Sequence, residues 1–586
     1  MIPVPQDING AIPADKFPTY RPWQWDGALR VVEALERGVK VVFVHAETGS
    51  GKSLLAETVR SMGYPHQSTP YLCTTISLQQ QIQGDFPYAK ILKGRSNYPT
   101  RHYHDMFPSL TCEDCDPDTV EIDLDEDAPD WLADDAAEHG LRALTRTSKD
   151  GTTTASRCDN CTVTALCPYV LARDDAYNAP LCVTNTSFFL REANMGRGRL
   201  SNKDLVIVDE ADEFFDRITD TFAITVPQWL RHERFFPLPR TSSNYEDIQE
   251  WLTELDMYLK DRVGDHERGR AQFVAEQGVR KWRRRLSSLE TLRVNVNIAA
   301  NDESPWVYQG PSQHSRKGYE RATLRPVWVG EWVHGFVWNH SEQWVLMSAS
   351  FGNIDLAAKH LGLAPEEYAT VHVDYTFPPE RKPVRFWPGA KAYTKKNERE
   401  GYDAVRDAVS KIRTILDWYP NDRILIHTFS HQRTKDIAEA LDNPRVIPFE
   451  GGGVVVRDER LTAFRETEGS VLISAGMERG YDFRYDECRV VILAKTPFPD
   501  FGDPVIAART RSGYMGQSWY DLTTARSIVQ MVGRGMRAED DTVIVYILDA
   551  SANKFLRGEG KKYLPQSFLN SVKFGRPLKP EFINGS

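Results

Sequence analysis

Short apolar runs rich in β-branched residues recur along the chain and alternate with segments that have the periodicity of helices. The runs are VVFVHA at 41–46, LVIVDEA at 205–211, WVLMSAS at 344–350, RILIHTF at 423–429, VLISAG at 471–476, RVVILAK at 489–495 and TVIVYILD at 542–549. Continuous apolar runs are typical of strands buried on both faces, and intervening helices are the usual crossovers between parallel strands. The pattern predicts an α/β protein with parallel sheets.

The first apolar run leads directly into AETGSGKSLLAETVR, which is a strand followed by a glycine-bearing loop and a helix. This order matches the Walker A phosphate-binding loop, with Ala46 in place of the first glycine of the general pattern. In such a loop backbone N–H groups face the phosphates, the lysine reaches the β and γ phosphates, and the next hydroxyl binds Mg²⁺. The expected nucleotide-binding residues are Thr48, Gly49, Ser50, Gly51, Lys52 and Ser53.

The run at 205–211 supplies the second half of a nucleotide site. Asp209 stands at the end of this run and is expected to hold Mg²⁺ together with Ser53, while Glu210 is placed to orient or deprotonate the attacking water. An acidic turn after a core strand is the alternative, and the upstream phosphate loop argues against it. We therefore expect ATP and Mg²⁺ as cofactors.

A second set of strand and helix patterns, over 423–549, ends in QMVGRGMRAEDD. In this segment Arg534 and Arg537 are three residues apart, which places them on one helical face close to Gln530. Guanidinium groups from a neighbouring lobe can stabilise charge on the transferring phosphoryl group. A basic solvated helix face is the alternative for the segment in isolation, and its position after the other motifs favours the catalytic role.

In their order these motifs resemble those of the iron–sulfur group of superfamily 2 helicases, the XPD-like and DinG-like family. DEAD stands at 209–212 where DEAH is common in the family, and SAS stands at 348–350 where a SAT-like motif is common. Both changes keep the polar groups. The matching stretches span nearly the whole chain and are YRPWQWDGAL at 20–29, AETGSGKS at 46–53, LKGRSNYP at 92–99, CPY at 167–169, LCVTNTSFFL at 181–190, DEAD, MSAS at 347–350, ERGYDF at 478–483, TPFPDFGDP at 496–504 and QMVGRGMR.

The resemblance implies two RecA-like lobes, with a cysteine-rich metal-cluster insertion and a helical arch-like insertion in the first lobe. It implies that Gln24 recognises adenine, that Gly480 and Asp482 link nucleotide state to the strand track, and that Arg534 and Arg537 are arginine fingers. The expected boundaries are 1–95, 181–215 and 306–375 for the first lobe, 96–180 for the cysteine-rich insertion, 216–305 for the arch-like insertion and 376–586 for the second lobe.

Five of the eight cysteines lie between residues 112 and 167. In the family the first cluster ligand directly follows a GRSNY-like stretch, but here Pro99 and Thr100 follow Tyr98, so the first ligand must come from further along. The resemblance implies a [4Fe–4S] cluster held by four thiolates, which leaves one of the five spare. Cys112 and Cys115 are both candidates for the first ligand, and of the two we favour Cys112 as the spare. The pairs CEDC and CDNC also suit a Zn²⁺ site, which leaves Cys167 unused. The five candidates are Cys112, Cys115, Cys158, Cys161 and Cys167.

The other three cysteines, Cys73, Cys182 and Cys488, lie in apolar runs and are expected to be buried core thiols. Between the two cysteine groups the acidic run 113–138 would repel a phosphate backbone, so we expect it to face away from a nucleic-acid strand.

Helical patterns such as YEDIQEWLTELDMYLKDRV and VRKWRRRLSSLETLRV fill the expected arch-like insertion. The basic stretch 280–285 surrounds Trp282, a combination found in proteins that bind single strands. The alternative is a solvated helix face with Trp282 packed inward.

Length and charge change this picture little. A chain of 586 residues with 41% hydrophobic and 26% charged residues is long enough for about three to five domains with packed cores. The net charge of -10 gives no overall attraction for nucleic acid, although a local basic groove is compatible with it. No apolar run is long enough for a membrane span and the first residues do not resemble a signal peptide, so we expect a cytoplasmic protein with no membrane partner.

Together these features predict an ATP-dependent DNA helicase that translocates on single-stranded DNA and unwinds forked DNA. The family implies the 5′-3′ direction, a monomer is expected, and replication or repair proteins are expected partners. Three alternatives stay open: an ATP-gated nucleic-acid-binding or assembly module without processive unwinding, a redox-sensing regulator, and a helicase acting on RNA or RNA–DNA hybrids.

Overall fold

A computed structural model of the protein describes most of the chain. The described residues are 2–3, 12–13, 15–47, 49–64, 68–99, 112, 144–147, 153–156, 168–194, 199–226, 239, 244–277, 279–312, 321–373, 378–449, 454–476, 483–536 and 540–574. Across these residues no helix combines the length and the apolar character that crossing a bilayer requires.

The first lobe is built on a parallel sheet of seven described strands in the order β14-β3-β13-β9-β4-β8-β5. Along β3, Val42 and Val44 belong to one apolar cluster, whereas Val41 and Phe43 belong to another, because successive side chains point to opposite faces. Both faces are therefore buried, as the apolar runs predict. The strands are β3 (Val41–His45), β4 (Thr69–Leu72), β5 (Lys90–Ile91), β8 (Leu181–Thr184), β9 (Lys203–Asp209), β13 (Ser341–Ser348) and β14 (Tyr368–His372).

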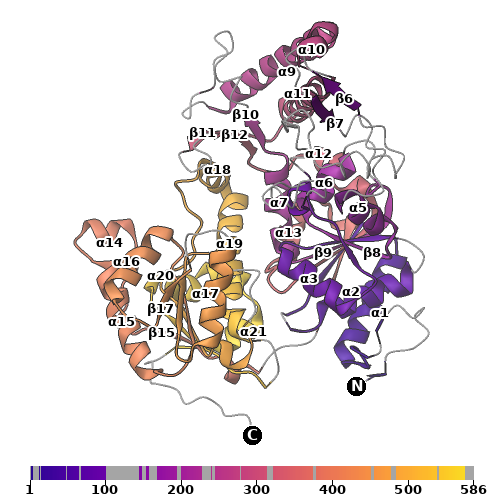
Figure 1. Ribbon diagram of the computed structural model, residues 1–586. Helices are drawn as coiled ribbons and strands as arrows, with labels where there is room; N and C mark the ends of the chain where they lie inside the picture. The colour runs from indigo at the N-terminus through magenta and orange to yellow at the C-terminus, as the bar shows by residue number, and fades with distance from the viewer. Residues whose placement is uncertain are drawn as a thin grey trace.

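Two groups of helices cover this sheet (Figure 1). The first group packs into the cluster that holds Val42 and consists of α1 (Pro22–Glu36), α2 (Lys52–Gly63) and α3 (Ile76–Asp85). The second packs into the cluster that holds Val41 and consists of α5 (Pro168–Asn178), α6 (Thr186–Asn194), α7 (Phe214–Thr221) and α13 (Ile354–His360). Short strands β1 (Ile2–Pro3) and β2 (Thr19–Tyr20) pair beside α1, and α12 (Trp332–Phe336) precedes β13.

The second lobe repeats this plan with seven described parallel strands in the order β17-β18-β16-β19-β20-β15-β21. Two parallel-sheet lobes are thus present, as predicted. The strands are β15 (Val384–Phe386), β16 (Ile424–His427), β17 (Val446–Pro448), β18 (Val471–Ser474), β19 (Val490–Leu493), β20 (Ile544–Ile547) and β21 (Val572–Lys573). The helices are α14 (Lys395–Arg399), α15 (Ala404–Trp418), α16 (His431–Leu441), α17 (Val454–Glu466), α18 (Pro504–Arg511), α19 (Gly513–Val532), α20 (Ala550–Arg557) and α21 (Gln566–Ser571).

A helical insertion extends from the end of the first lobe (Figure 1). It contains α9 (Tyr245–Arg268), α10 (Arg270–Gln277) and α11 (Val279–Ala300). Its core includes Leu252, Leu255 and Trp306, so α9 packs on an antiparallel sheet made of β10 (Ile224–Val226), β12 (Arg321–Pro326) and β11 (Trp306–Ser312). Strands β11 and β12 therefore pair within the insertion, although the boundaries expected from the sequence assign residues 306–326 to the first lobe.

The cysteine-rich insertion lies largely outside the described residues. Within it the structure describes a pair of antiparallel strands, β6 (Leu144–Thr147) and β7 (Thr153–Ser156), and the single residue Cys112. The cysteines Cys73, Cys182 and Cys488 are buried in strands or at their ends, which confirms their expected role in the core.

A buried arginine of the second lobe anchors α18 on the first lobe. Arg509 is 2% exposed, and its guanidinium lies 4.7 Å from the ring centre of Phe215 and 4.9 Å from that of Trp519. Its Nε donates to the Val327 carbonyl at 2.7 Å, and its Nη1 pairs with Asp216 at 3.0 Å. One side chain therefore joins α18 to α7 and to the strand end after β12.

Replacing Arg509 by Met should loosen this anchor. The variant leaves the Val327 carbonyl without its buried donor and removes the ion pair with Asp216, which costs about 2–3 kcal/mol of unfolding free energy. Thermal unfolding followed by circular dichroism measures the loss. Arg511→Met, at an exposed position of the same helix, is the matched control and should change the midpoint little. An equal decrease of the unfolding midpoint in both variants would contradict the role of Arg509 as an anchor between α18 and the first lobe.

Candidate nucleotide-binding site

The phosphate loop joins the end of β3 to the start of α2, where the sequence predicts it. Gly49 has φ 81° and Gly51 has φ 84°, a left-handed backbone that glycine adopts without strain. A Cβ atom at Gly51 would also lie 1.9 Å from Nε2 of Gln24. Gly51 is thus required by its backbone, and a side chain at this position would displace the Gln24 amide. Thr48, also predicted for this loop, lies outside the described residues.

The start of α1 holds the phosphate loop from the side. Gln24 is buried; its Nε2 donates to the Ser50 carbonyl at 3.1 Å, and its Oε1 accepts from the Arg21 backbone N–H at 2.9 Å. Trp23 Nε1 also donates to Ser50 O, at 3.3 Å, and Arg21 Nη1 donates to Gly49 O, at 3.1 Å. Adenine recognition by Gln24 stays a prediction, while its contacts show that it positions the loop.

Lys52 and the acidic pair at the end of β9 come together, as the motifs predict. Lys52 is 8% exposed, and its Nζ lies 3.7 Å from Oε1 of Glu210. Asp209 is buried; it accepts from the Tyr71 hydroxyl at 3.2 Å and from the Glu210 backbone N–H at 2.9 Å. Ser53 also forms a hydrogen bond with the Tyr71 hydroxyl, so Ser53 and Asp209 share Tyr71 as a neighbour. Burial raises the pKa of Tyr71, and the bond with Ser53 partly opposes this shift. Such a set of hydroxyl and carboxylate oxygens suits Mg²⁺.

Burial raises the pKa of Asp209 from its ordinary value of 3.8 to about 6, although the nearby Lys52 ammonium favours the carboxylate. Glu210 follows in the left-handed backbone region with φ 51°, which costs a non-glycine residue about 1 kcal/mol or more. This strained turn carries the Glu210 side chain to Lys52.

Asp212 connects this acidic motif to two other motifs. Its carboxylate accepts from the hydroxyls of Ser348 at 2.8 Å and Ser350 at 3.1 Å, at the end of β13. It also accepts from Nε2 of Gln530 at 2.6 Å, and the same Nε2 donates to Ser350 Oγ at 2.9 Å. Because Gln530 lies on α19 of the second lobe, these bonds cross between the lobes.

Arg526 belongs to the same contact and was missed in the sequence. Its Nη1 donates to the Asp212 carbonyl at 3.2 Å, and its Nη2 donates to the Phe351 carbonyl at 3.1 Å. The signal is its position four residues before Gln530, which places both side chains on one face of α19.

The other predicted residues of the second lobe are described only in part. Arg534 is buried. Burial of His427, at the end of β16, and to a smaller extent the nearby charge of Arg534 lower the pKa of His427 to about 3. The expected role of Arg534 as an arginine finger stays a prediction. Arg537, Gly480 and Asp482 lie outside the described residues.

Of the five candidate metal ligands the structure describes Cys112. Its backbone N–H donates to the Tyr98 carbonyl at 2.7 Å, and its Sγ lies 3.4 Å from the Pro99 carbonyl. Cys115, Cys158, Cys161 and Cys167 fall outside the described residues, and within the described part no group of three or more His, Cys, Asp or Glu side chains is arranged to hold a metal ion.

Comparisons with known proteins bear on this arrangement. Residues 412–571 match a family model described as the helicase C-terminal domain. The regulator of telomere elongation helicase 1 homolog of Drosophila melanogaster is 30% identical over 106 residues, which is 16% of this chain and 11% of that protein. ATP-dependent DNA helicase CHL1 of Candida glabrata is 21% identical over 174 residues, 26% of this chain and 21% of that protein. The chain thus matches only a small part of each relative.

Solved structures match over a greater length. An XPD helicase superposes with a TM-score of 0.58 at 13% identity, covering 96% of this chain and 100% of the other. Xpd4 of S. tokodaii gives 0.53 at 12% identity, covering 95% and 100%. The chain has the fold of an XPD-like helicase. The predicted resemblance is confirmed for the two lobes of this XPD-like fold, and the second lobe carries the matched C-terminal domain.

The raised pKa of Asp209 predicts a stability change with a definite pH dependence. The folded protein holds the proton on Asp209 more tightly than the unfolded chain, so the carboxylate form destabilises the fold above about pH 6 and the penalty vanishes below pH 3.8. Asp209→Asn should therefore raise the unfolding free energy at pH 8 by about 2–3 kcal/mol, without nucleotide or magnesium, and by much less at pH 4.5.

Denaturant titrations at pH 8 and pH 4.5 measure this difference. Asp26→Asn, at a side chain that is 68% exposed, is the control and should change stability little at both values. Lower stability of Asp209→Asn at pH 8 would contradict the assigned pKa.

Proposed function

We propose that the protein is an ATP-dependent DNA helicase that steps along single-stranded DNA and separates forked DNA. The observation that carries this proposal is the buried set of bonds from Asp212 to Ser348, Ser350 and Gln530, which joins the nucleotide-binding lobe to the second lobe. A nucleotide held by the first lobe can thereby change the position of the second. The name of one relative, ATP-dependent DNA helicase CHL1, supports DNA as the substrate.

The chain's own residues divide the work of hydrolysis. Lys52 binds the β and γ phosphates, Ser53 and Asp209 hold the Mg²⁺ ion, and Glu210 orients the attacking water. The ion, when bound, neutralises charge on the phosphates. Arg534 and Arg537 are the proposed arginine fingers, and Gly480 and Asp482 are proposed to contact the strand track. The 5′-3′ direction, action as a monomer, cytoplasmic location and partnership with replication or repair proteins belong to the same proposal.

Lys52→Ala should abolish both ATP hydrolysis and the unwinding of a forked duplex, because it removes the cation that binds the phosphates. Glu210→Gln should keep nucleotide binding and lower turnover about a hundredfold or more, since it removes the group that orients water. Phosphate release and a fluorescent strand-displacement assay measure these effects. Lys90→Ala, at an exposed position of β5, is the control.

The alternatives give different results in the same assays. ATP-dependent DNA binding without strand separation would indicate a clamp or assembly module. Stronger stimulation and displacement on RNA or RNA–DNA hybrids would indicate an RNA or hybrid helicase. A turnover that changes on oxidation without loss of the fold would indicate a redox-sensing regulator.

We also propose a [4Fe–4S] cluster in the cysteine-rich insertion. The position of Cys112 supports it: this thiol lies against Tyr98 and Pro99, at the end of the GRSNY stretch where the family has its first ligand. It shares an apolar cluster with Tyr169, two residues after Cys167. The sequence favours Cys112 as the spare, whereas this position favours Cys112 as the first ligand and Cys115 as the spare.

Metal and sulfide analysis of anaerobically purified protein tests this assignment. Cys112→Ser and Cys167→Ser should each lose iron and acid-labile sulfide, since each removes a proposed ligand, while Cys115→Ser should keep both. Cys488→Ala, in the second lobe, is the control. Zinc without sulfide would favour the alternative Zn²⁺ site and overturn the iron–sulfur proposal.

A further inference from the structure

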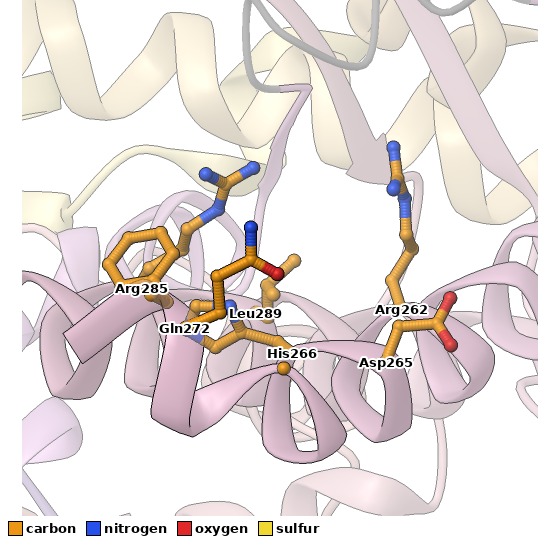
Figure 2. Close-up of a pocket in the computed structure, with 8 residues that line it drawn as sticks. Arg262, Asp265, His266, Gln272, Arg285 and Leu289 are labelled. Carbon is orange, nitrogen blue, oxygen red and sulfur yellow. The ribbon is translucent and has the colours of Figure 1, made fainter. Parts of the chain in front are cut away.

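A cavity of about 310 Å³ opens at the free end of the helical insertion, away from the nucleotide site. Arg262 of α9, Gln272 of α10 and Arg285 of α11 project to the same side in Figure 2. Phe273 and Leu289 also line the cavity and supply apolar surface. The cavity therefore combines two guanidinium groups and an amide with an apolar wall.

Trp282 and His266 hold the helices around this cavity together. Trp282 Nε1 donates to the His266 carbonyl at 3.0 Å, and His266 Nε2 donates to the Trp282 carbonyl at 2.9 Å. Their rings stack with centroids 5.7 Å apart, and Arg270 lies 5.0 Å from the ring centre of Trp282. Trp282 is thus packed inward, which agrees with the alternative interpretation of the basic stretch 280–285. Its ring joins α9 to α11 rather than stacking on a base.

The two cavity arginines are positioned by aromatic rings. The guanidinium of Arg285 lies 5.9 Å from the ring centre of Phe273. That of Arg262 lies 5.4 Å from the ring centre of Tyr258, and its Nε donates to the Tyr258 hydroxyl at 2.8 Å. The N–H groups of a guanidinium are donors of the kind that suits the paired oxygens of a phosphate.

Charge makes this end of the insertion attractive to anions. Among the Asp, Glu, Lys and Arg side chains that line the cavity, Arg262 and Arg285 are cationic and Asp265 is anionic. Asp265 is a carboxylate in the cavity lining, and it pairs with Arg268 at 2.6 Å, which offsets its charge. An anion in the cavity therefore meets a positive local potential.

We propose that this cavity binds a phosphodiester group of single-stranded nucleic acid. Arg262 and Arg285 pair with the phosphate oxygens, Gln272 donates from its amide, and the apolar wall accommodates the sugar. This site rests on the proposed function, because the strand on which the lobes act is the one that reaches it. It gives the insertion a contact of its own with the strand, based on backbone charge and independent of base sequence.

The double variant Arg262→Gln, Arg285→Gln tests the site in the full-length protein. Anisotropy of a fluorescent oligothymidine should show about tenfold weaker binding, and the dependence of log K on log salt should become shallower by about 0.7, since the cavity neutralises one phosphate of the single strand. The corresponding double Lys variant should keep the salt dependence. Basal ATP hydrolysis should be unchanged, because these residues lie outside the nucleotide site.

Lys260→Gln is the matched control, because Lys260 is an exposed cation of α9 that does not line the cavity. An equal loss of binding in this control, or an unchanged affinity and salt dependence in the double variant, would overturn the site. A thermal-stability titration distinguishes the source of the phosphate: oligothymidine should stabilise wild type more than the double variant. Stabilisation by inorganic phosphate with none by oligothymidine would indicate a free-phosphate site and overturn the strand site. Wild-type ATP hydrolysis that fails to respond to DNA would count against the proposed function separately.

Discussion

The arrangement of the two lobes depends on one buried carboxylate. Asp212 accepts hydrogen bonds from two serines of its own lobe and from Gln530 of the other. A buried carboxylate is costly unless donors surround it, so removal of any one donor destabilises a contact that both lobes need. Since Asp212 is three residues from Asp209 and two from Glu210, the contact lies directly beside the proposed catalytic groups. The contact between the lobes and the proposed catalytic groups are therefore neighbours in the structure.

The phosphate loop is held by packing that its motif does not encode. Gln24, Trp23 and Arg21 bond the carbonyls of the loop, and a side chain at Gly51 would displace the Gln24 amide from this contact. The start of α1 therefore fixes the loop before a nucleotide arrives. A preformed loop lowers the entropy lost on binding, which favours productive positioning of the phosphates.

The sequence predicts the parts of this molecule better than their contacts. Apolar runs such as VVFVHA identify strands buried on both faces, and the motif spacing correctly brings Lys52 to Glu210. The pairing of β11 and β12 within the insertion was not predictable from periodicity, because short strands carry no signal of their partners. The roles of Arg509 and Arg526 were missed for the same reason: a buried arginine looks like a surface arginine until its acceptors are known. Trp282 illustrates the reverse, since its basic neighbours favour a binding role while its ring is packed against His266.

Helix α19 connects these separate features. Next to its first turn, Arg509 anchors α18 to α7, while Gln530 in its last turn bonds Asp212. Between them Trp519 lies in the ring cluster around Arg509, and Arg526 bonds the Phe351 carbonyl. A helix of 20 residues is about 30 Å long and behaves as a rigid rod over that distance. Any movement of the second lobe that breaks the Gln530 contact must therefore also bend α19 or shift its anchor. Since the anchor includes the strand end after β12, the helical insertion and the nucleotide site are mechanically linked through one helix.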